Sequence, residues 1–246
     1  MKVGIEDLTQ LEILRSVFTL AFVIISILMG IKMISKYFSL KNHEILTVGL
    51  TWIFLSSSWW SNAFSFLTIL LFGYAFEDYL YLLLLNAFTP LAIICWIYSF
   101  SHIVYSKYKY HITILYLLVC LSFLFYVLIA LSIDTTLIGA RKGTFDYSRT
   151  TIPLLFALFS LATAIVTGLI FSSKSMKSTD PIVQWKGRFL LFAILSFVGA
   201  SILDTLFVGP YGIFRIIVRL ILIASGIGYY FAFFLPTRLA EILIRR

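Results

Sequence analysis

Long apolar runs separated by short polar stretches make up nearly the whole chain. A membrane helix needs about 20 mostly apolar residues, because the hydrocarbon core of a bilayer is about 30 Å thick. We expect each such run to form one membrane-spanning helix. The predicted helices cover about residues 11–34, 45–72, 79–105, 111–133, 150–172, 186–208 and 211–236, and the longest predicted loop is 134–149. The pattern predicts an all-α membrane protein, a single seven-transmembrane helix bundle over residues 1–246.

The composition agrees with a bilayer environment. Hydrophobic residues make up 61% of the chain and charged residues 12%, and the mean hydropathy is +1.02. Soluble domains carry roughly 45–50% apolar and about 25% charged residues. Seven spans and their short loops account for nearly all of the length, so no soluble catalytic domain is expected. We expect a multi-pass protein of the cell membrane, with the lipid bilayer as its partner.

Lysine and arginine are distributed unevenly between the two ends of the predicted helices. Cytoplasmic loops of membrane proteins carry the excess of these residues. Twelve lie on one side, namely Lys32, Lys36, Lys41, Lys107, Lys109, Lys174, Lys177, Lys186, Arg188, Arg238, Arg245 and Arg246, and five on the other, namely Lys2, Arg15, Arg141, Lys142 and Arg149. The bias predicts an N-terminus outside and a cytoplasmic C-terminus. Because the net charge of +8 comes mainly from loops between spans, it does not indicate a nucleic-acid partner.

Three charged residues interrupt the last two predicted helices, Asp204 in the first and Arg215 and Arg219 in the second. An ionisable group inside a membrane costs about 2.5–3.5 kcal/mol on insertion scales, so it normally faces the bundle interior and pairs. The two arginines are four residues apart and therefore share a helix face. We predict that Asp204 contacts Arg215 or Arg219 across the predicted turn at Gly209 and Pro210.

Polar residues from four predicted helices lie at similar depth in the outer half of the bundle. With a rise of 1.5 Å per residue, Arg219 lies roughly 12 Å below the outer end of its helix. The functional interpretation is a pocket open to the outside, whose candidate ligand-binding residues are Asn62, Asn86, Asp204, Arg215 and Arg219, with Trp59 and Trp60 as candidate walls. The excess of arginine over aspartate favours a small anionic or zwitterionic ligand, such as a carboxylate or a lipid headgroup.

A structural interpretation of the same residues stays open. In it, Asp204 pairs with Arg215, Arg219 reaches the headgroups or a backbone carbonyl, and the two asparagines hold helices together. Four serines near the tryptophan pair either loosen the second helix beside a pocket or permit close helix packing, namely Ser56, Ser57, Ser58 and Ser61.

The chain lacks the residues that several known functions of seven-helix proteins require. A retinal protein needs a lysine in its last helix, and a zinc hydrolase needs a ligand set, but His43, His102 and His111 all lie at the predicted cytoplasmic edge. An intramembrane serine protease needs a histidine near a buried serine, and the last three predicted helices contain none. Cys95 and Cys120 lie within spans and are interpreted as small buried residues. We therefore expect no catalytic residue, no metal site, no cofactor and no enzyme activity.

Two sequence runs carry a resemblance to a known family. The run "NAFTPLAIICWIYSFSHIVY" places a proline within the third predicted helix, and "DPIVQWKGRFLLFAILSFVGA" places proline, glutamine and arginine just before or at the start of the sixth. With the short turn into the last helix, these runs resemble the seven-transmembrane sensor region of some histidine kinases. The run Ser57-Ser58-Trp59-Trp60 also resembles stand-alone archaeal seven-helix membrane proteins of uncharacterised function.

The resemblance implies a receptor-like or sensor-like protein. In the kinases an output domain follows the last helix, whereas ten residues follow here, so a separate cytoplasmic or membrane partner would carry the signal. A small transporter and a structural or lipid-binding bundle are the alternatives. Many transporters have helices broken at matching positions of two repeats. Pro90 in the third predicted helix has no counterpart in the seventh before Pro236, which favours the receptor-like interpretation.

Overall fold

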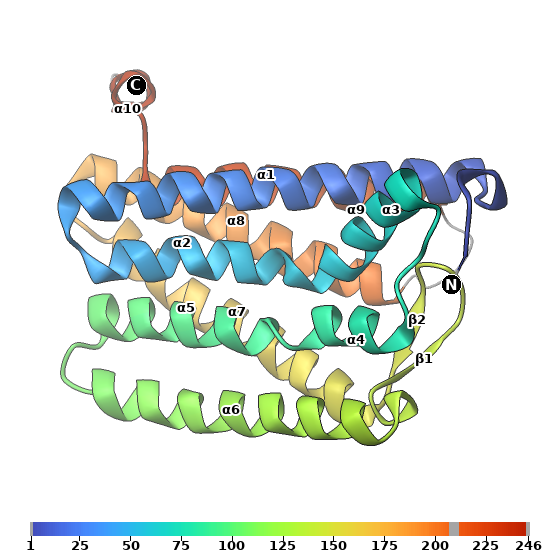
Figure 1. The fold of residues 1–246 in the computed structure, drawn as a ribbon. Coiled ribbons are helices and arrows are strands. Elements are labelled where there is room, and N and C mark those ends of the chain that lie inside the picture. Colours follow the sequence, from blue (N-terminus) through green and yellow to red (C-terminus); the bar gives the residue numbers. More distant parts are fainter. Residues whose placement is uncertain (1, 207–211, 245–246) are drawn as a thin grey trace.

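The computed structural model describes residues 2–206 and 212–244, and Figure 1 shows a bundle of helices that run roughly along one axis. The helices are α1 (Gln10–Leu40), α2 (His43–Leu55), α3 (Trp60–Phe72), α4 (Asp78–Asn86), α5 (Thr89–Val104), α6 (Lys109–Ile133), α7 (Thr151–Met176), α8 (Pro181–Leu206), α9 (Gly212–Phe233) and α10 (Thr237–Ile244). Short 3-10 helices are η1 (Ile5–Asp7), η2 (Ser56–Trp59) and η3 (Thr135–Leu137), and the strands are β1 (Gly139–Arg141) and β2 (Tyr147–Arg149). The predicted all-α class is confirmed.

Within the described residues, six helical segments are long and apolar enough to cross a bilayer, namely 10–40, 78–104, 109–133, 151–176, 181–205 and 214–233. Large apolar side chains are exposed on their outward faces, for example Leu28 of α1, Leu115 of α6 and Leu155 of α7. Exposed apolar surface of this extent is expected where helices contact lipid. The segments indicate a multi-pass membrane protein.

The segment predicted as one helix over residues 45–72 is divided instead into α2 and α3, of 13 residues each. Between them, the Ser56 hydroxyl donates to the Ile53 carbonyl at 2.7 Å and accepts the Trp60 indole N–H at 3.0 Å. Serine hydroxyls that bond to nearby backbone compete with regular helix geometry and often bend helices. The break at η2 therefore agrees with the interpretation that the serines loosen this segment.

The helix predicted over residues 79–105 bends at Ala87 and Phe88, between α4 and α5. Pro90 lies in the first turn of α5, where the missing N–H costs no helical hydrogen bond. Just before the bend, the Asn86 side-chain amide donates to the Leu82 carbonyl at 2.9 Å, within its own helix.

Helices α1 and α2 approach each other closely at two glycines. A Cβ atom on Gly30 would lie 2.9 Å from the Gly49 carbonyl oxygen, and one on Gly49 would lie 3.0 Å from the Gly30 carbonyl oxygen. Such small residues let membrane helices pack at short distance. The adjoining core is aromatic, because Trp52 stacks on Tyr229 with ring centroids 4.6 Å apart.

The connection between α6 and α7 forms a β-hairpin, although the sequence predicts only a loop there. The two strands pair antiparallel, with Gly139 opposite Arg149 and Arg141 opposite Tyr147. Figure 1 shows this hairpin at the end of the bundle that also carries the N-terminus, whereas α10 and the C-terminus lie at the other end. These are called the hairpin end and the opposite end below.

The predicted turn at Gly209 and Pro210 lies outside the described residues, as do the last residues of the sixth predicted helix. Helix α9 ends at Phe233, three residues before Pro236, and α10 follows as a separate short helix. At the start of the bundle, α1 begins at a capping box, in which the Thr9 backbone N–H donates to the Glu12 carboxylate at 2.9 Å. Such caps satisfy backbone donors that a helix leaves free at its first turn.

Candidate functional site

A cavity of about 400 Å³ lies in the hairpin-end half of the bundle, a size typical of small-molecule sites. Six of the seven predicted site residues line it, namely Trp59, Asn62, Asn86, Asp204, Arg215 and Arg219. Trp60 is not part of the wall, which corrects the predicted pair of tryptophans. Its N–H is bonded to Ser56 and its ring packs 5.0 Å from Phe88. Ligand binding by the six residues stays a prediction.

A charge pair joins α8 and α9 at the cavity. Nη1 of Arg219 lies 3.0 Å from Oδ1 of Asp204, so the predicted contact of Asp204 with one of the two arginines is confirmed. Arg219 Nε also donates to the Thr19 hydroxyl on α1 at 2.9 Å. The Trp59 indole N–H donates to Oδ2 of Asp204 at 3.0 Å. The pair therefore connects α1, η2, α8 and α9.

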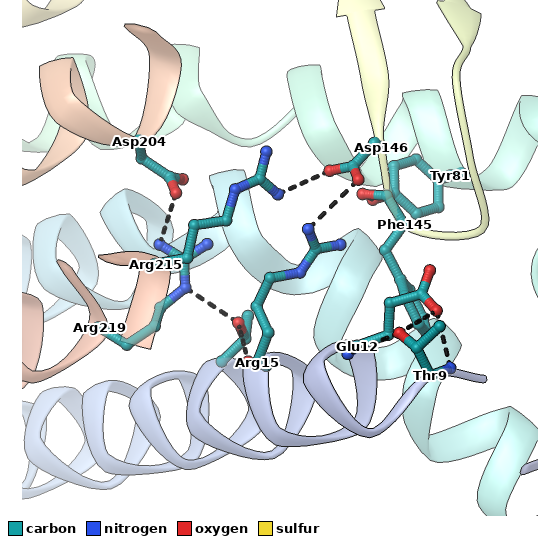
Figure 2. A network of polar contacts seen from close by, with 10 residues as sticks. Thr9, Glu12, Arg15, Tyr81, Phe145, Asp146, Asp204, Arg215 and Arg219 are labelled. Atoms are coloured by element: carbon teal, nitrogen blue, oxygen red, sulfur yellow. Dashed lines mark hydrogen bonds and ion pairs between the residues drawn. The ribbon is translucent and has the colours of Figure 1, made fainter. Parts of the chain in front are cut away.

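Arg215 has a partner that the sequence did not predict. Its Nη1 lies 2.7 Å from Oδ1 of Asp146, and Nη1 of Arg15 lies 3.2 Å from Oδ2 of the same carboxylate. Figure 2 shows the two guanidinium groups approaching Asp146 from α9 and α1. The structural interpretation that pairs Asp204 with Arg215 is therefore corrected. The last two predicted helices contain two arginines and only one aspartate. This imbalance was the one sign in the sequence that a carboxylate from another segment pairs with the second arginine.

Further contacts hold the hairpin against α4. The Tyr81 hydroxyl donates to the Phe145 carbonyl at 2.7 Å, and the Tyr81 ring stacks on Tyr147 at 4.2 Å. The Tyr147 hydroxyl donates to the Asp78 carboxylate at 2.6 Å, and Arg141 Nε donates to the same carboxylate at 2.7 Å. Because residues 145–149 also line the cavity, the hairpin forms its wall at this end of the bundle.

Burial and charge act in opposite directions on Asp146. Burial of the carboxylate raises its pKa, whereas the charges and hydrogen bonds of Arg15 and Arg215 lower it. The arginines have the larger combined effect, so the pKa lies below its ordinary value of 3.8. Asp146 is therefore ionised at neutral pH. Burial and the hydrogen bond to Asp78 raise the pKa of Tyr147 well above 10, so its hydroxyl stays protonated and remains a donor.

Arg149, at the end of β2, adds a positive charge that the sequence indicated only as a loop charge. Its side chain lines the cavity and takes part in no hydrogen bond or ion pair among the described residues, and its Nε is buried. Burial lowers the pKa of Arg149, while the charge of Asp204 raises it. The guanidinium group of an arginine nevertheless stays protonated at neutral pH, so Arg149 is a cation in the cavity wall.

The cavity wall is positively charged at the hairpin end and uncharged, in large part apolar, further in. Three arginines and two aspartates line it, namely Arg149, Arg215, Arg219, Asp146 and Asp204, which leaves one positive charge in excess. Farther from the hairpin the lining is uncharged, with Phe123, Leu161, Ala164 and Phe197 as its apolar part and neutral polar residues such as Asn62 and Ser160 beside them. The arrangement can hold an anionic group beside the arginines and an apolar group below them.

The described residues contain no cluster of three or more histidine, cysteine and acidic side chains that could hold a metal ion. No protein-family model, curated protein or solved structure matches the chain. The resemblance to the sensor region of histidine kinases therefore stays a prediction.

Proposed function

We propose that this protein is a receptor-like or sensor-like membrane protein whose cavity binds an anionic or zwitterionic ligand. The observation that carries the proposal is Arg149, a cationic side chain that lines a ligand-sized cavity without a hydrogen bond or ion pair among the described residues. Arg149 is partly buried and its Nε is fully so, and a charge removed from water is costly unless a counter-charge or hydrogen bonds compensate it. A carboxylate or phosphate would provide both, because it matches the donor geometry of the guanidinium group.

The charge network offers a route from ligand to conformational change. Arg215 lines the cavity and pairs with Asp146, so an anion in the cavity competes with the hairpin carboxylate for the same guanidinium group. Helices α1, α8 and α9 meet in this network through Arg15, Asp204 and Arg219, and all three run to the opposite end. A ligand shifts a conformational equilibrium only if it binds one state more tightly than the other. Here an anion would bind more tightly to the state in which Arg215 is released from Asp146. A separate partner would receive the signal there.

We infer a topology of seven crossings of the cell membrane, with the N-terminus outside and the C-terminus in the cytoplasm. The seventh crossing would be residues 43–72, in which α2, η2 and α3 together lead from the opposite end back to the hairpin end (Figure 1). The positive-inside bias supports this orientation, as do termini at opposite ends of the bundle. The hairpin end would then face outward.

Cysteine labelling with a membrane-impermeant maleimide tests this topology. Lys142→Cys in the hairpin should react in intact cells, whereas Lys177→Cys after α7 should react only once the membrane is opened. If only Lys177→Cys reacts in intact cells, the orientation is the reverse of the one proposed, and the cavity does not face outward.

A small transporter is the second candidate function, but the packing below the cavity favours a receptor. Trp96 lies 6.3 Å from Tyr229 and 6.1 Å from Phe171, measured between ring centroids, and Trp52 stacks on Tyr229. Transport would require this aromatic packing to open for each ligand. Uptake of a bound labelled anion into proteoliposomes would favour the transporter, and a structural bundle would show no anion-specific binding at all.

Thermal unfolding of the purified protein tests ligand binding. We would follow tryptophan fluorescence in nanodiscs with a panel of carboxylates and phosphates of short and long chain. At least one anion should raise the melting temperature of the wild type, and Arg149→Gln should abolish that rise. Lys142→Gln is the matched control, because it removes the same charge from an exposed position of the same hairpin that is outside the cavity wall. An equal rise in Arg149→Gln, or none in the wild type, would refute the proposal.

A further inference from the structure

Helices α7 and α8 pack tightly near the opposite end of the bundle. A Cβ atom on Gly168 of α7 would lie 2.8 Å from the side chain of Ile194 on α8. A Cβ atom on Gly187 of α8 would lie 2.9 Å from the backbone nitrogen of Met176 on α7. No side chain larger than hydrogen fits at either glycine without a shift, so the two helices leave no space between them there.

Towards the hairpin end the same two helices separate, and the cavity lies between them. Figure 1 shows α7 and α8 diverging in this direction. The cavity wall includes Ala157 and Leu161 of α7 and Ser201 and Thr205 of α8. Near the opposite end the facing residues of α7 and α8 touch each other, whereas near the hairpin end they line the cavity.

This space reaches the apolar surface of the bundle. Leu154 on α7 and Thr205 on α8 line the cavity and are also exposed. Their neighbours Leu155 and Ile202 belong to the apolar outer faces of the two helices, with 58% and 42% exposure. Leu154 is three residues into α7, roughly 4–5 Å along the helix, and Thr205 is the last residue of the apolar segment 181–205. The opening therefore lies at the hairpin-end edge of the lipid-facing surface of the two helices.

The lining of the cavity changes from charged to apolar along its length. Arg149 and Arg215 lie at the hairpin end, whereas Phe123 and Phe156 stack face to face, with ring centroids 3.7 Å apart, on the α6 and α7 side. Phe197 of α8 continues the apolar wall. A ligand with an anionic end and an apolar end therefore matches both parts of the wall.

We propose that the ligand is an anionic amphiphile, with a carboxylate or phosphate headgroup and an acyl chain, and that it enters from the bilayer between α7 and α8. The inference rests on the proposed function, because it names the ligand class of the same cavity. A small soluble anion would leave the apolar wall and the lateral opening unused. A neutral lipid would leave the Arg149 guanidinium group without a hydrogen-bonded counter-charge.

Photo-crosslinking tests the ligand class. Protein in phosphatidylcholine nanodiscs is irradiated with a long-chain fatty acid that carries a diazirine near the chain end, and the labelled residues are mapped. Labels should fall on the apolar wall around Phe123, Phe156 and Leu161. Oleate and oleoyl lysophosphatidate should compete, and the stronger competitor identifies the preferred headgroup. Acetate, inorganic phosphate and oleyl alcohol should not compete.

Two tryptophan substitutions one residue apart test the route of entry. Ala157→Trp blocks the space between α7 and α8 just inside the opening and should lower labelling at least tenfold. Leu158→Trp adds the same side chain to the lipid-facing surface, where Leu158 is 52% exposed and outside the cavity wall, and should leave labelling unchanged. If Ala157→Trp loses the thermal unfolding transition of the wild type, Ala157→Leu replaces it.

Each contrary outcome separates this inference from the proposed function. Competition by acetate or phosphate as strong as that by oleate would overturn the amphiphile and keep the anion site. Competition by oleyl alcohol equal to oleate would overturn the recognition of charge, and the proposed function with it. Labels confined to the lipid-facing surfaces of the helices, and insensitive to every competitor, would overturn the inference outright.

Discussion

Replacing Asp146 with asparagine removes the carboxylate that Arg15 and Arg215 share. The two arginine side chains are 6% and 7% exposed, whereas Asp146 is 31% exposed. Removing one partner of a fully buried ion pair costs about 3–5 kcal/mol. Because solvent screens this partly exposed carboxylate, we expect a loss near the lower limit, about 3 kcal/mol. At about 2–4 °C per kcal/mol for a chain of this size, the melting temperature should fall by about 6–12 °C.

The assay is thermal unfolding in nanodiscs, together with hydrogen exchange of the hairpin amides at residues 139–149. Asp146→Asn should increase the exchange of the hairpin more than that of α5. Asp134→Asn is the matched control, because Asp134 is exposed in the same connection and its side chain accepts the Thr136 N–H at 2.8 Å, a bond that asparagine can also accept. The control should change the melting temperature by less than a third as much.

The pH dependence of the loss has a definite sign. Because the pKa of Asp146 is lower in the folded protein than its ordinary value of 3.8, its stabilisation is fully present above that value and is lost as the pH falls through the folded-state pKa. The difference between the wild type and Asp146→Asn should therefore be constant from pH 5 to 8 and become smaller below about pH 4.

Replacing Asp146, Arg15 and Arg215 together tests whether the three residues stabilise the protein as one ion-pair network or independently. Asp146→Leu combined with Arg15→Met and Arg215→Met leaves no buried charge without a partner, and apolar replacements of buried ionic groups are often neutral. The triple variant should therefore be more stable than Asp146→Asn. A loss equal to the sum of the three single losses would refute the shared pairing, as would a pH-dependent difference between pH 5 and 8.

Two further changes test other parts of the bundle by thermal unfolding. Asp204→Ala should lower the melting temperature more than the double change Asp204→Leu with Arg219→Leu, because the single change leaves a buried guanidinium group unpaired; additive losses would mean that the two residues are not coupled. Gly30→Ala should cost about 1–3 kcal/mol, since its Cβ meets a carbonyl oxygen of α2. Gly199→Ala, whose Cβ meets nothing within 4 Å, should be neutral or stabilising, and an equal loss in both would refute the close packing.

The positions of most long helices could be predicted from the sequence, because lipid imposes one length and one composition on every spanning segment. The depth of polar residues along those helices was also predictable, since each residue adds a fixed rise. This is why Asn62, Asn86, Asp204 and Arg219 were expected at a similar level, and the structure places all four around one cavity.

The sequence predicted one continuous helix where η2 divides the chain, although loosening by the serines was one interpretation, and it did not predict the hairpin. Neither feature depends on hydrophobic length. Ser56 bends its segment through hydrogen bonds to Ile53 and Trp60, and the run remains apolar enough to look continuous. Asp146 and Arg149 lie in a connection whose composition is that of a loop. The role of Asp146 follows from its ion pairs with α1 and α9, and that of Arg149 from its place in the cavity wall. No spacing within the connection itself indicates either role.

The competition between Asp146 and a ligand anion gives the last prediction. Arg215 can neutralise the hairpin carboxylate or a headgroup, and coupling between two groups that share one partner is reciprocal. Asp146→Asn should therefore destabilise the protein and yet bind an anionic amphiphile more tightly, by about the 5–150-fold typical of such coupling. Binding would be measured by displacement of the photoreactive fatty acid in nanodiscs. Arg149→Gln should weaken binding in the same assay. If Asp146→Asn also weakens it, the carboxylate positions Arg215 for the ligand instead of competing with it, and the route proposed from ligand to helices would have to be abandoned.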